Sequence, residues 1–373
     1  MSAPKRAIGM MSGTSMDGID LALVETDGET VGETIGGARR AAFRPYTDME
    51  RALIRTSLQE ARIVRDRAER TPAMAAAEAA ITRAHEELVR SFLAESGLQP
   101  QDIAVIGFHG QTVFHAPERG LTVQIGDADA LASALSIPVV TDMRVADVAA
   151  GGEGAPLVPV YHRALVSGAG LARPVAVVNI GGVANATWIG AGEDDLIAFD
   201  TGPGNALMDD FVHRRTGAAM DAGGVLAAKG TVDEALLARW LDDPYFARRP
   251  PKSLDRDAFA CEGLEDLATE DGLATLAAFT AATITRGLAL VPQMPSMLVV
   301  VGGGARNPTL LDHLARLSGL AVSTGDAIGW SPEFVEAEAF AFLAVRSLEG
   351  LPLTFPGTTG VSAPLTGGRL VGA

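Results

Sequence analysis

The chain lacks most of the features that mark secreted, membrane-spanning or metal-cluster proteins. Its 373 residues contain one cysteine, Cys261, which excludes an intrachain disulfide framework and a metal site built from several thiolates. No apolar run reaches the roughly 18 residues that a membrane-spanning helix needs, and the first residues, "MSAPKRAIGMMSG", have no continuous apolar segment of the signal-peptide kind. We therefore expect a soluble, cytoplasmic protein with no membrane partner.

Positive charge is also scarce. The chain has 30 Lys and Arg against 46 Asp and Glu, a formal net charge of −16, and it shows no basic patch, so nucleic acid is not an expected partner. The chain has neither a G-x-x-x-x-G-K-[ST] phosphate loop nor a G-x-G-x-x-G after the first expected strand, so a nucleotide would be bound in another way.

What the chain does have is an alternation of apolar strand-like runs and longer helical runs, which predicts an α/β fold. Its length exceeds what one core usually supports, so we expect two domains, residues 1–145 and 146–373, with the C-terminal segment allowed to return to the first. The expected strands are Ala7–Met11, Ile19–Glu25, Ile103–Gly107, Thr122–Ile125, Pro138–Thr141, Val175–Ile180, Leu196–Phe199 and Met297–Val301. The expected helices are about Met49–Arg67, Ala73–Glu95, Ala128–Leu135, Asn205–Thr216, Glu234–Leu241, Leu273–Ala289, Pro308–Leu317 and Pro332–Leu348.

Two segments in different halves of the chain share one design. "AIGMMSGTSMDGIDLALVE" and "AVVNIGGVANATWIG" each predict strand, glycine-rich turn, strand, so either an internal duplication or a chance pairing of two hairpins explains them. In the first segment, Gly allows positive φ while Ser, Thr and Asp bond nearby backbone, which is typical of a polar turn. The same groups suit a phosphate, because amides and hydroxyls can surround its oxygens while a carboxylate holds Mg²⁺ through water.

Five glycine-rich turns follow expected strands: "SGTSMDG", "FHGQT", "NIGGVAN", "DTGPGN" and "GGGARNP". Loops that follow parallel strands meet at one edge of the sheet, where ligands of α/β proteins usually bind. Together the five turns favour a phosphate-rich ligand.

Two of these turns suggest specific roles. In "AFDTGPGNALMDD", Asp200 is expected at a strand end, where it either serves as a general base or bonds the amides of its own turn, and Asn205 is expected to cap the following helix. In "GGGARNP", the absence of side chains at Gly302–Gly304 allows either a flat base against the backbone or close packing of helix on strand. Asn307–Pro308 then begins a helix.

Polar residues in two further motifs suggest substrate contacts. In "GFHGQTVFHAP" the histidine spacing fits no zinc pattern, so we expect His109 and Gln111 to contact a polar substrate. In "VVTDMRVAD", Arg144 follows a buried strand and either holds an anion bidentately or pairs with Asp142 or Asp147.

A helix near the C-terminus carries Glu336 and Glu338. Residues two apart face different sides of a helix, so we expect at most one of the two at a ligand site.

Eight motifs together resemble the anhydro-N-acetylmuramic acid kinase family: "GMMSGTSMDGID", "GFHGQTVFHAP", "VQIGD", "DVAAGGEGAPLVP", "VNIGGVAN", "FDTGPGNALMD", "PPKS" and "GGGARNP". The match runs in order from about Gly9 to Gly360. The resemblance implies two related ribonuclease-H-like domains with an interdomain ATP cleft, the actin/hexokinase-like fold. It also implies ATP and Mg²⁺ as cofactors and a small anhydro amino sugar as substrate, and it allows a homodimer.

The resemblance also implies roles for individual residues. Asp200 would be the catalytic base, and Glu336 would position water or sugar. The residues implied for ATP are Gly13, Thr14, Ser15, Met16, Asp17, Gly18, Ile19, Asp20, Gly181, Gly182, Gly202, Gly204, Gly302, Gly303, Gly304 and Asn307. Those implied for the sugar are His109, Gln111, Thr112, Gln124, Asp142 and Arg144. Which groups hold the metal is not implied.

The implied reaction belongs to peptidoglycan recycling. In the anhydro sugar O6 is bridged to C1, so water attacks C1 while O6 receives the γ-phosphoryl group, giving N-acetylmuramic acid 6-phosphate and ADP. The alternatives are another small-molecule kinase of the same superfamily and a non-catalytic ATP-driven clamp.

The chain departs from the family pattern in three motifs, and five of the changed positions bear on the sugar. An expected "FRRRD" is "MRVAD", an expected "GGQGAP" contains Glu, and an expected "PKSTGR" is "PKSLDR". The departures are Val145, Ala146, Glu153, Leu254 and Asp255. They put in question the contacts with the lactyl and N-acetyl groups, and so the sugar preference.

Overall fold

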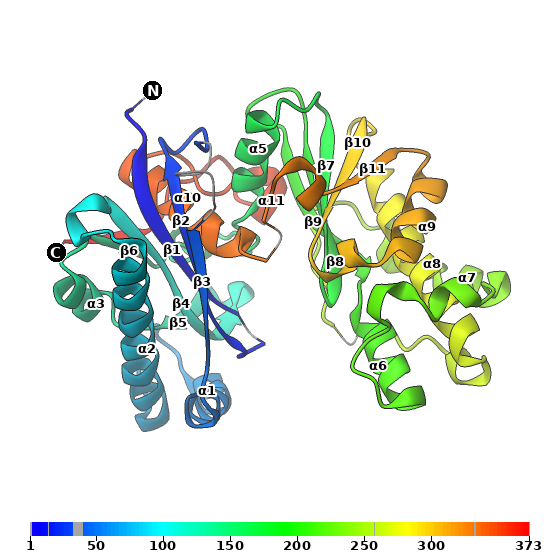
Figure 1. Ribbon diagram of the computed structural model, residues 1–373, viewed down its shortest axis with the longest axis horizontal. Helices are drawn as coiled ribbons and strands as arrows, with labels where there is room; N and C mark the ends of the chain where they lie inside the picture. The colour runs from blue at the N-terminus through cyan, green and yellow to red at the C-terminus, as the bar shows by residue number, and fades with distance from the viewer. Residues whose placement is uncertain (1, 14, 33–39, 257, 332, 373) are drawn as a thin grey trace. The chain divides into compact units, whose positions relative to one another are not determined.

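A computed structural model describes residues 2–13, 15–32, 40–256, 258–331 and 333–372 (Figure 1). The chain divides into two compact units, each of mixed helix and strand, which confirms the α/β class. Unit 1 is Met1–Gly168 with Glu333–Ala373, and unit 2 is Ala169–Pro332.

Unit 1 is built on a seven-stranded sheet in the order β12-β6-β4-β1-β2-β3, with β5 paired to β4. Its strands are β1 (Lys5–Ser12), β2 (Gly18–Thr26), β3 (Arg40–Pro45), β4 (Val105–Ala116), β5 (Leu121–Ile125), β6 (Val139–Thr141) and β12 (Arg369–Val371). Its α-helices are α1 (Asp48–Glu60), α2 (Pro72–Ser96), α3 (Ala128–Leu135), α4 (Val145–Ala149), α5 (Pro159–Gly168), α10 (Val335–Leu348) and α11 (Pro356–Thr359).

Unit 2 is built on a five-stranded sheet in the order β11-β10-β7-β8-β9. Its strands are β7 (Val175–Ile180), β8 (Val183–Ile189), β9 (Leu196–Pro203), β10 (Met297–Val301) and β11 (Ala321–Thr324). Its α-helices are α6 (Ala206–Thr216), α7 (Glu234–Trp240), α8 (Thr269–Leu288) and α9 (Pro308–Ser318).

The two sheets repeat one topology. In unit 1, β1, β2 and β3 pair antiparallel, and β4 and β6 then extend the sheet parallel to β1. In unit 2, β7, β8 and β9 pair antiparallel, and β10 and β11 extend the sheet parallel to β7. This is the strand order of the ribonuclease-H-like fold, present twice. Of the two explanations for the paired glycine hairpins, the structure therefore supports internal duplication.

Each unit has its own hydrophobic core around its sheet. In unit 2, residues 175–178 of β7 are fully buried, so both faces of this central strand are shielded from solvent. In unit 1, α10 lies directly on the backbone of β1 and β4. A Cβ added at Gly9 would come within 1.9 Å of Ala337 O, and one added at Gly107 within 2.0 Å of Phe340 O. This close approach fixes the helix that carries Glu336.

The expected domain boundary at residues 145–146 lies inside unit 1. The helix α5, which follows that boundary, packs on α10 through the rings of Tyr161 and Phe342, whose centroids are 5.4 Å apart. The hydroxyl of Tyr161 also donates to Glu338 Oε2 at 2.8 Å. The C-terminal segment from Glu333 belongs to unit 1, a return that the sequence allowed.

The expected strands are found, but two of them continue further than the sequence suggested. "FHGQT" lies inside β4 rather than in a loop, because β5 pairs with the outer half of β4. Asp200 lies inside β9, which pairs with β8 past a bulge at residues 200–202 and ends at Pro203. The strands β3, β11 and β12 and the helices α4, α5 and α11 were not expected. The helix expected to reach Arg67 ends at Glu60.

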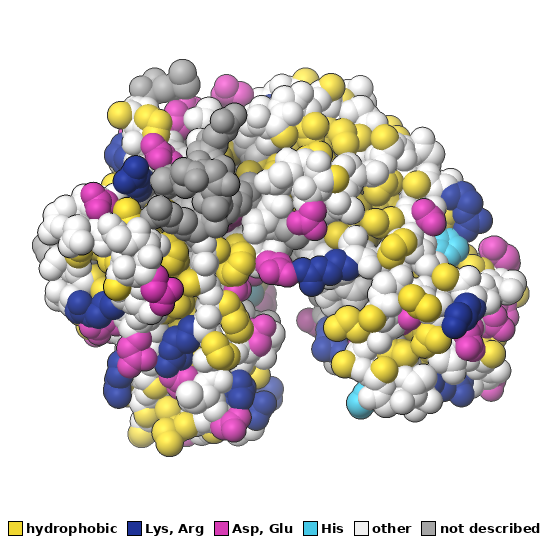
Figure 2. Space-filling view, in the orientation of Figure 1, with side chains coloured by type: hydrophobic (Ala, Val, Ile, Leu, Met, Phe, Trp, Pro, Cys, Tyr) yellow, Lys and Arg dark blue, Asp and Glu magenta, His cyan; other side chains and the backbone are white. Residues whose placement is uncertain are grey.

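Charged side chains of both signs lie on the face of the molecule that Figure 2 draws. On the face drawn in Figure 2, Lys and Arg side chains are scattered in small groups among Asp and Glu. No helix among the described residues is long and apolar enough to cross a membrane.

Candidate functional site

The loop that joins β1 to β2 is a tight polar turn. The Ser15 hydroxyl donates to Asp17 Oδ1 at 2.6 Å, and the Gly18 amide donates to the same oxygen at 3.0 Å. Met16 has a φ of 57°, and its amide bonds Gly13 O. Thr14 lies outside the described residues. The predicted turn is therefore present, with Asp17 as its central acceptor.

The side chain of Gln111 is hydrogen-bonded to the backbone of this loop. Its side chain is fully buried, and Nε2 donates to Gly13 O at 3.1 Å. Among the described residues its Oε1 is one of the few buried side-chain oxygens with no hydrogen-bond partner. Ile19, predicted to contact ATP, is fully buried in the core of unit 1, so its side chain contributes packing.

Several carboxylates lie close together beside this loop. Burial, the largest cause, and the negative charges of Asp17, Glu336 and Glu333 together raise the pKa of Asp20 to about 6. Such crowding suits a bound cation. Within the described ranges no three His, Cys, Asp or Glu residues are arranged to hold a metal directly. A cation here would therefore be held partly through water or phosphate, as Mg²⁺ usually is.

Arg144 is fixed by three hydrogen bonds. Its Nε and Nη2 both donate to His109 Nε2 at 3.1 Å, and its Nη1 donates to Gly154 O at 2.9 Å. The sequence left a pairing with Asp142 or Asp147 open, but both carboxylates bond other groups. His109 was predicted to contact substrate, yet it is only 5% exposed and its ring nitrogens are occupied by Arg144 and Gly110 O.

Glu336 begins α10 and has a raised pKa. Desolvation raises the pKa of its carboxyl, Asp17 raises it further, and the positive charge of Arg144 lowers it. Of the two glutamates on α10, Glu338 is buried against the Tyr161 hydroxyl while Glu336 reaches solvent. The two glutamates therefore face different sides of α10, as expected, and a ligand contact by Glu336 stays a prediction.

Asp147 anchors the loop "GGEGAP". Its Oδ1 accepts from the Gly154 amide and its Oδ2 from the Thr359 hydroxyl, both at 2.6 Å. The Glu153 amide also donates to Thr359 O at 2.7 Å. The peptide groups on either side of Gly154 are thus held by Asp147 and Arg144 together.

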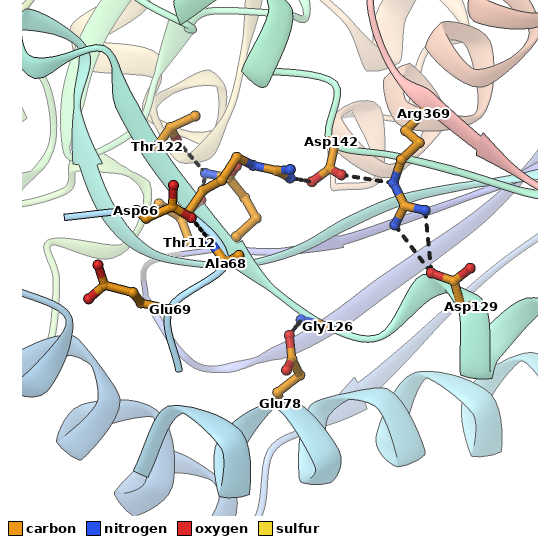
Figure 3. Close-up of polar contacts among 12 residues, drawn as sticks. Asp66, Ala68, Glu69, Glu78, Thr112, Thr122, Gly126, Asp129, Asp142 and Arg369 are labelled. Carbon is orange, nitrogen blue, oxygen red and sulfur yellow. Dashed lines mark hydrogen bonds and ion pairs between the residues drawn. The ribbon is translucent and has the colours of Figure 1, made fainter. Parts of the chain in front are cut away.

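The other predicted sugar residues lie in a separate group, on a surface pocket of about 350 Å³ in unit 1 (Figure 3). Gln124 lines it and donates to the hydroxyls of Thr112, at 3.3 Å, and Thr122, at 2.7 Å. Asp142 lines it too and bridges two guanidinium groups, pairing with Arg67 and, at 3.2 Å, with Arg369. Sequence reasoning missed both arginines, because nothing local places residues 67 and 369 beside residue 142.

In unit 2, Asp200 is held by a segment far along the chain. Its amide donates to Lys252 O at 3.0 Å, and the Leu254 amide donates to Asp200 Oδ2 at 2.8 Å. The Tyr245 hydroxyl donates to Asp200 O at 2.7 Å. The motif "PPKS" thus lies against β9. Asp200 does not follow the strand as predicted, and its carboxylate bonds Leu254 rather than the amides of its own turn.

The surroundings of Asp200 make it a candidate base. Burial raises its pKa, and although the hydrogen bond from the Leu254 amide and the charge of Lys252 act to lower it, the resulting pKa is about 6. Lys252 is 7% exposed, and burial lowers its own pKa to about 8. A carboxylate with a pKa near 6 is ionised at neutral pH yet accepts a proton readily, as a general base must.

The glycine turns of unit 2 pack on one another. The amides of Gly204 and Asn205 donate to Gly182 O and Gly181 O, at 2.9 and 2.7 Å. Asn205 stands at the start of α6, but its Nδ2 donates to Ile180 O, so the expected side-chain cap is not made.

The triple glycine turn is explained partly by packing. A Cβ at Gly302 would come within 2.3 Å of Asn179 Oδ1, and one at Gly304 within 2.4 Å of Ile180 Cγ2, whereas Gly303 has more room. In the β9 turn, a Cβ at Gly202 would meet Thr283 Oγ1 at 2.5 Å. As expected, Asn307 begins α9, and its Oδ1 accepts from the Leu310 amide.

The whole chain matches one family. Residues 5–372 match the model described as "Anhydro-N-acetylmuramic acid kinase". The protein of that name from Methylobacterium nodulans is 55% identical over 97% of this chain and 98% of its own, and that from Rhodopseudomonas palustris strain HaA2 is 54% identical over 98% of each. Among solved structures, component A of (R)-2-hydroxyglutaryl-CoA dehydratase from Acidaminococcus fermentans covers 92% of this chain and 99% of its own, at 11% identity and a TM-score of 0.46. These sequence matches, rather than the structural likeness, show that the chain belongs to the anhydro-N-acetylmuramic acid kinase family.

Proposed function

We propose that the chain is an ATP-dependent kinase that opens 1,6-anhydro-N-acetylmuramic acid and phosphorylates O6, giving N-acetylmuramic acid 6-phosphate and ADP in peptidoglycan recycling. The family match over residues 5–372 carries the proposal. In this sugar O6 is bonded to C1 and has no free hydroxyl. Phosphoryl transfer to O6 therefore requires that the C1–O6 bond break and that water add to C1.

In this reaction Asp200 takes the proton of the attacking water. Its raised pKa of about 6 supports the role, because the carboxylate is charged at neutral pH and gains a proton easily. The Leu254 amide on Oδ2 fixes one oxygen of the carboxylate and so orients the other.

Glu336 assists by orienting water or sugar, and the neighbouring Arg144 favours its ionised form. Arg144 has N–H groups beyond those bonded to His109 and Gly154, so it can also bind an anionic group such as the lactyl carboxylate of the sugar.

ATP is proposed to contact the residues of the glycine turns named above, with Gly13–Asp20 near its phosphates. The crowded carboxylates Asp17 and Asp20 fit a hydrated Mg²⁺, since a cation would relieve the repulsion that raises the pKa of Asp20. When bound, the ion neutralises charge on the transferred phosphoryl group.

The departures from the family pattern leave this machinery in place. Leu254 contacts Asp200 through its backbone amide, so its side chain is free to vary. Val145 and Ala146 lie in α4 next to Arg144, and Glu153 precedes the anchored Gly154. These three positions and Asp255 remain the ones where sugar preference is predicted to differ.

The decisive test is ADP release with a panel of sugars. We expect rapid release with the anhydro sugar and slow release with N-acetylmuramic acid, whereas equal release with a simple hexose would favour another small-molecule kinase. A single turnover in ¹⁸O-water, quenched before anomeric exchange, should label C1 and leave phosphate unlabelled. Label in free phosphate would indicate bare ATP hydrolysis, as expected of a clamp.

Location and assembly stay predictions from the sequence. We propose a cytoplasmic enzyme, which cell fractionation tests, and we allow a homodimer, which light scattering after size-exclusion chromatography tests.

A further inference from the structure

In the described part of unit 2, Asp200 lies on the outer edge of the sheet. β9 is the last strand in the order of that sheet, and β8 pairs with its inner side. The N–H and C=O groups of an outer edge need partners other than a strand. Those of Asp200 have them: its amide donates to Lys252 O at 3.0 Å, and its carbonyl oxygen accepts from the Tyr245 hydroxyl at 2.7 Å. A tyrosine side chain thus replaces a strand at this point.

Three hydrogen bonds close into a triangle of Asp200, Lys252 and Tyr245. The Asp200 amide donates to Lys252 O, the Lys252 ammonium donates to Tyr245 O at 3.0 Å, and the Tyr245 hydroxyl donates back to Asp200 O. The ammonium also lies 4.3 Å from the centroid of the Tyr245 ring. Each residue of the triangle is held by both of the others, so the loss of one bond loosens the rest.

Tyr245 is itself firmly placed. Its amide donates to Asp243 Oδ1 at 2.8 Å, and its ring packs edge to face with Phe246 and Phe259, at centroid distances of 5.8 and 6.1 Å. Burial and the negative charge of Asp200 both raise the pKa of the Tyr245 hydroxyl. The hydroxyl therefore stays protonated and remains a donor to Asp200 O.

We propose that Tyr245 is a positioning residue for the proposed catalytic base, because its hydroxyl fixes the backbone of Asp200 and so the direction of the carboxylate. The inference rests on the proposed function for the role of Asp200. Tyr245 touches neither substrate nor reacting atoms in this assignment.

The backbone of Asp200 needs such a support because β9 is irregular there. A bulge lies at residues 200–202, and a bulge re-aims side chains and bends the strand. The carboxylate is held separately by the Leu254 amide, which donates to Oδ2 at 2.8 Å and lies two residues beyond Lys252. Residues 245–254 therefore hold both the backbone and the carboxylate of Asp200, and the Tyr245 hydroxyl links the start of this segment to the strand.

Tyr245→Phe tests the proposal by removing one oxygen atom. It keeps the ring against Phe246 and Phe259, and it keeps the carbonyl that accepts from Lys252. The variant therefore separates the hydroxyl from the packing of the ring.

Trp188→Phe is the matched control. Trp188 Nε1 also donates to a backbone carbonyl, Gln293 O at 2.8 Å, and the side chain is buried in the same core. Trp188 pairs with Ile197 near the start of β9, away from the triangle. This variant loses stability through the same kind of hydrogen bond without touching Asp200.

We expect Tyr245→Phe to lower kcat by about 5–30-fold, because a small misplacement of a reacting group is costly. KM for ATP and for the sugar should change little. Trp188→Phe should lower the urea midpoint at least as much as Tyr245→Phe does, yet keep the kcat of wild type. A wild-type kcat in Tyr245→Phe overturns the proposal, and so does an equal loss of kcat in the two variants.

Hydrogen exchange needs no turnover, so it distinguishes failure of this inference from failure of the proposed function. The Leu254 amide is observed in ¹⁵N-leucine-labelled protein and identified by its loss in Leu254→Met. It should exchange roughly 3–10-fold faster in Tyr245→Phe than in wild type, the effect of weakening about one hydrogen bond, and at the wild-type rate in Trp188→Phe. Equal rates in wild type and Tyr245→Phe overturn the positioning role, whatever reaction the enzyme catalyses. If exchange is faster but Asp200→Asn stays fully active, the proposed role of Asp200 fails, and with it the catalytic meaning of the triangle.

Discussion

Replacing Asp200 by Asn should abolish most activity and at the same time stabilise the protein. Asn removes the charge and the basicity but keeps an oxygen that can accept from the Leu254 amide, so the local backbone contacts survive. Loss of a positioned general base should lower kcat by about 10²–10⁴-fold. Nucleotide binding should persist.

The stabilisation follows from the direction of the pKa shift. The pKa of Asp200 rises from 3.8 to about 6 on folding, so the folded state binds this proton more tightly than the unfolded state. Stability from this group is therefore present below pH 3.8 and is lost as the pH rises through about 6. A shift of about two units corresponds to roughly 3 kcal/mol at pH 7, and partial exposure of the side chain reduces the expected gain in Asp200→Asn to about 1–3 kcal/mol.

Urea unfolding at pH 7 and at pH 4 measures this difference. The gain in free energy of unfolding should appear at pH 7 and be much smaller at pH 4. Asp210→Asn is the control, because Asp210 is exposed and forms an ion pair with Arg256, so its effect should stay within about 0.5 kcal/mol. If Asp200→Asn destabilises the protein at pH 7, the carboxylate is a structural acceptor and the reasoning fails.

Three further predictions concern the supports of the site. Lys252→Met should move the acid limb of kcat/KM above pH 6, because the charge of Lys252 lowers the pKa of Asp200, and an unmoved limb would contradict this. Gly107→Ala should lower the free energy of unfolding in urea by about 1–3 kcal/mol, because its Cβ would overlap Phe340 O. Gly168→Ala is the control and should be nearly neutral, because a Cβ there would meet no atom within 4 Å. Similar effects of the two variants would refute the close packing of α10. Asp147→Ala should lower the free energy of unfolding by about 2–5 kcal/mol, because it leaves the Gly154 amide and the Thr359 hydroxyl without their acceptor. Asp147→Asn should lower it less. Equal losses in the two variants would mean that Asp147 does not stabilise the protein through these hydrogen bonds.

The central strands were predictable because their signal is local. The runs that form β1, β7 and β10 are largely apolar segments, each followed by a glycine-rich turn, and burial on both faces of a sheet demands an apolar run. The edge strands β3 and β12 carry no such signal. "RAAFRP" and "RLV" form strands because a neighbouring strand offers hydrogen bonds, which a single sequence does not record.

The sequence pointed to candidate site residues, but it did not show which side chains surround them. Asp200 and Glu336 were identified by motif, but the partners that set their pKa values come from elsewhere in the chain. Lys252 reaches Asp200 across 52 positions, and Arg144 influences Glu336 across 192. His109 was predicted to contact the sugar because the histidine spacing fits no zinc pattern, and only the placement of Arg144 showed its acceptor role.

The contact between α10 and the glycines of β1 and β4 has a consequence for engineering. With no side chains between helix and sheet at Gly9 and Gly107, there is no compressible layer that could absorb a shift of one against the other. Asp20 on β2 and Glu336 on α10 therefore belong to one closely packed block of unit 1. Efforts to retune which sugar is accepted should leave Gly9 and Gly107 untouched, because a side chain at either position would push the helix that carries Glu336 away from the sheet.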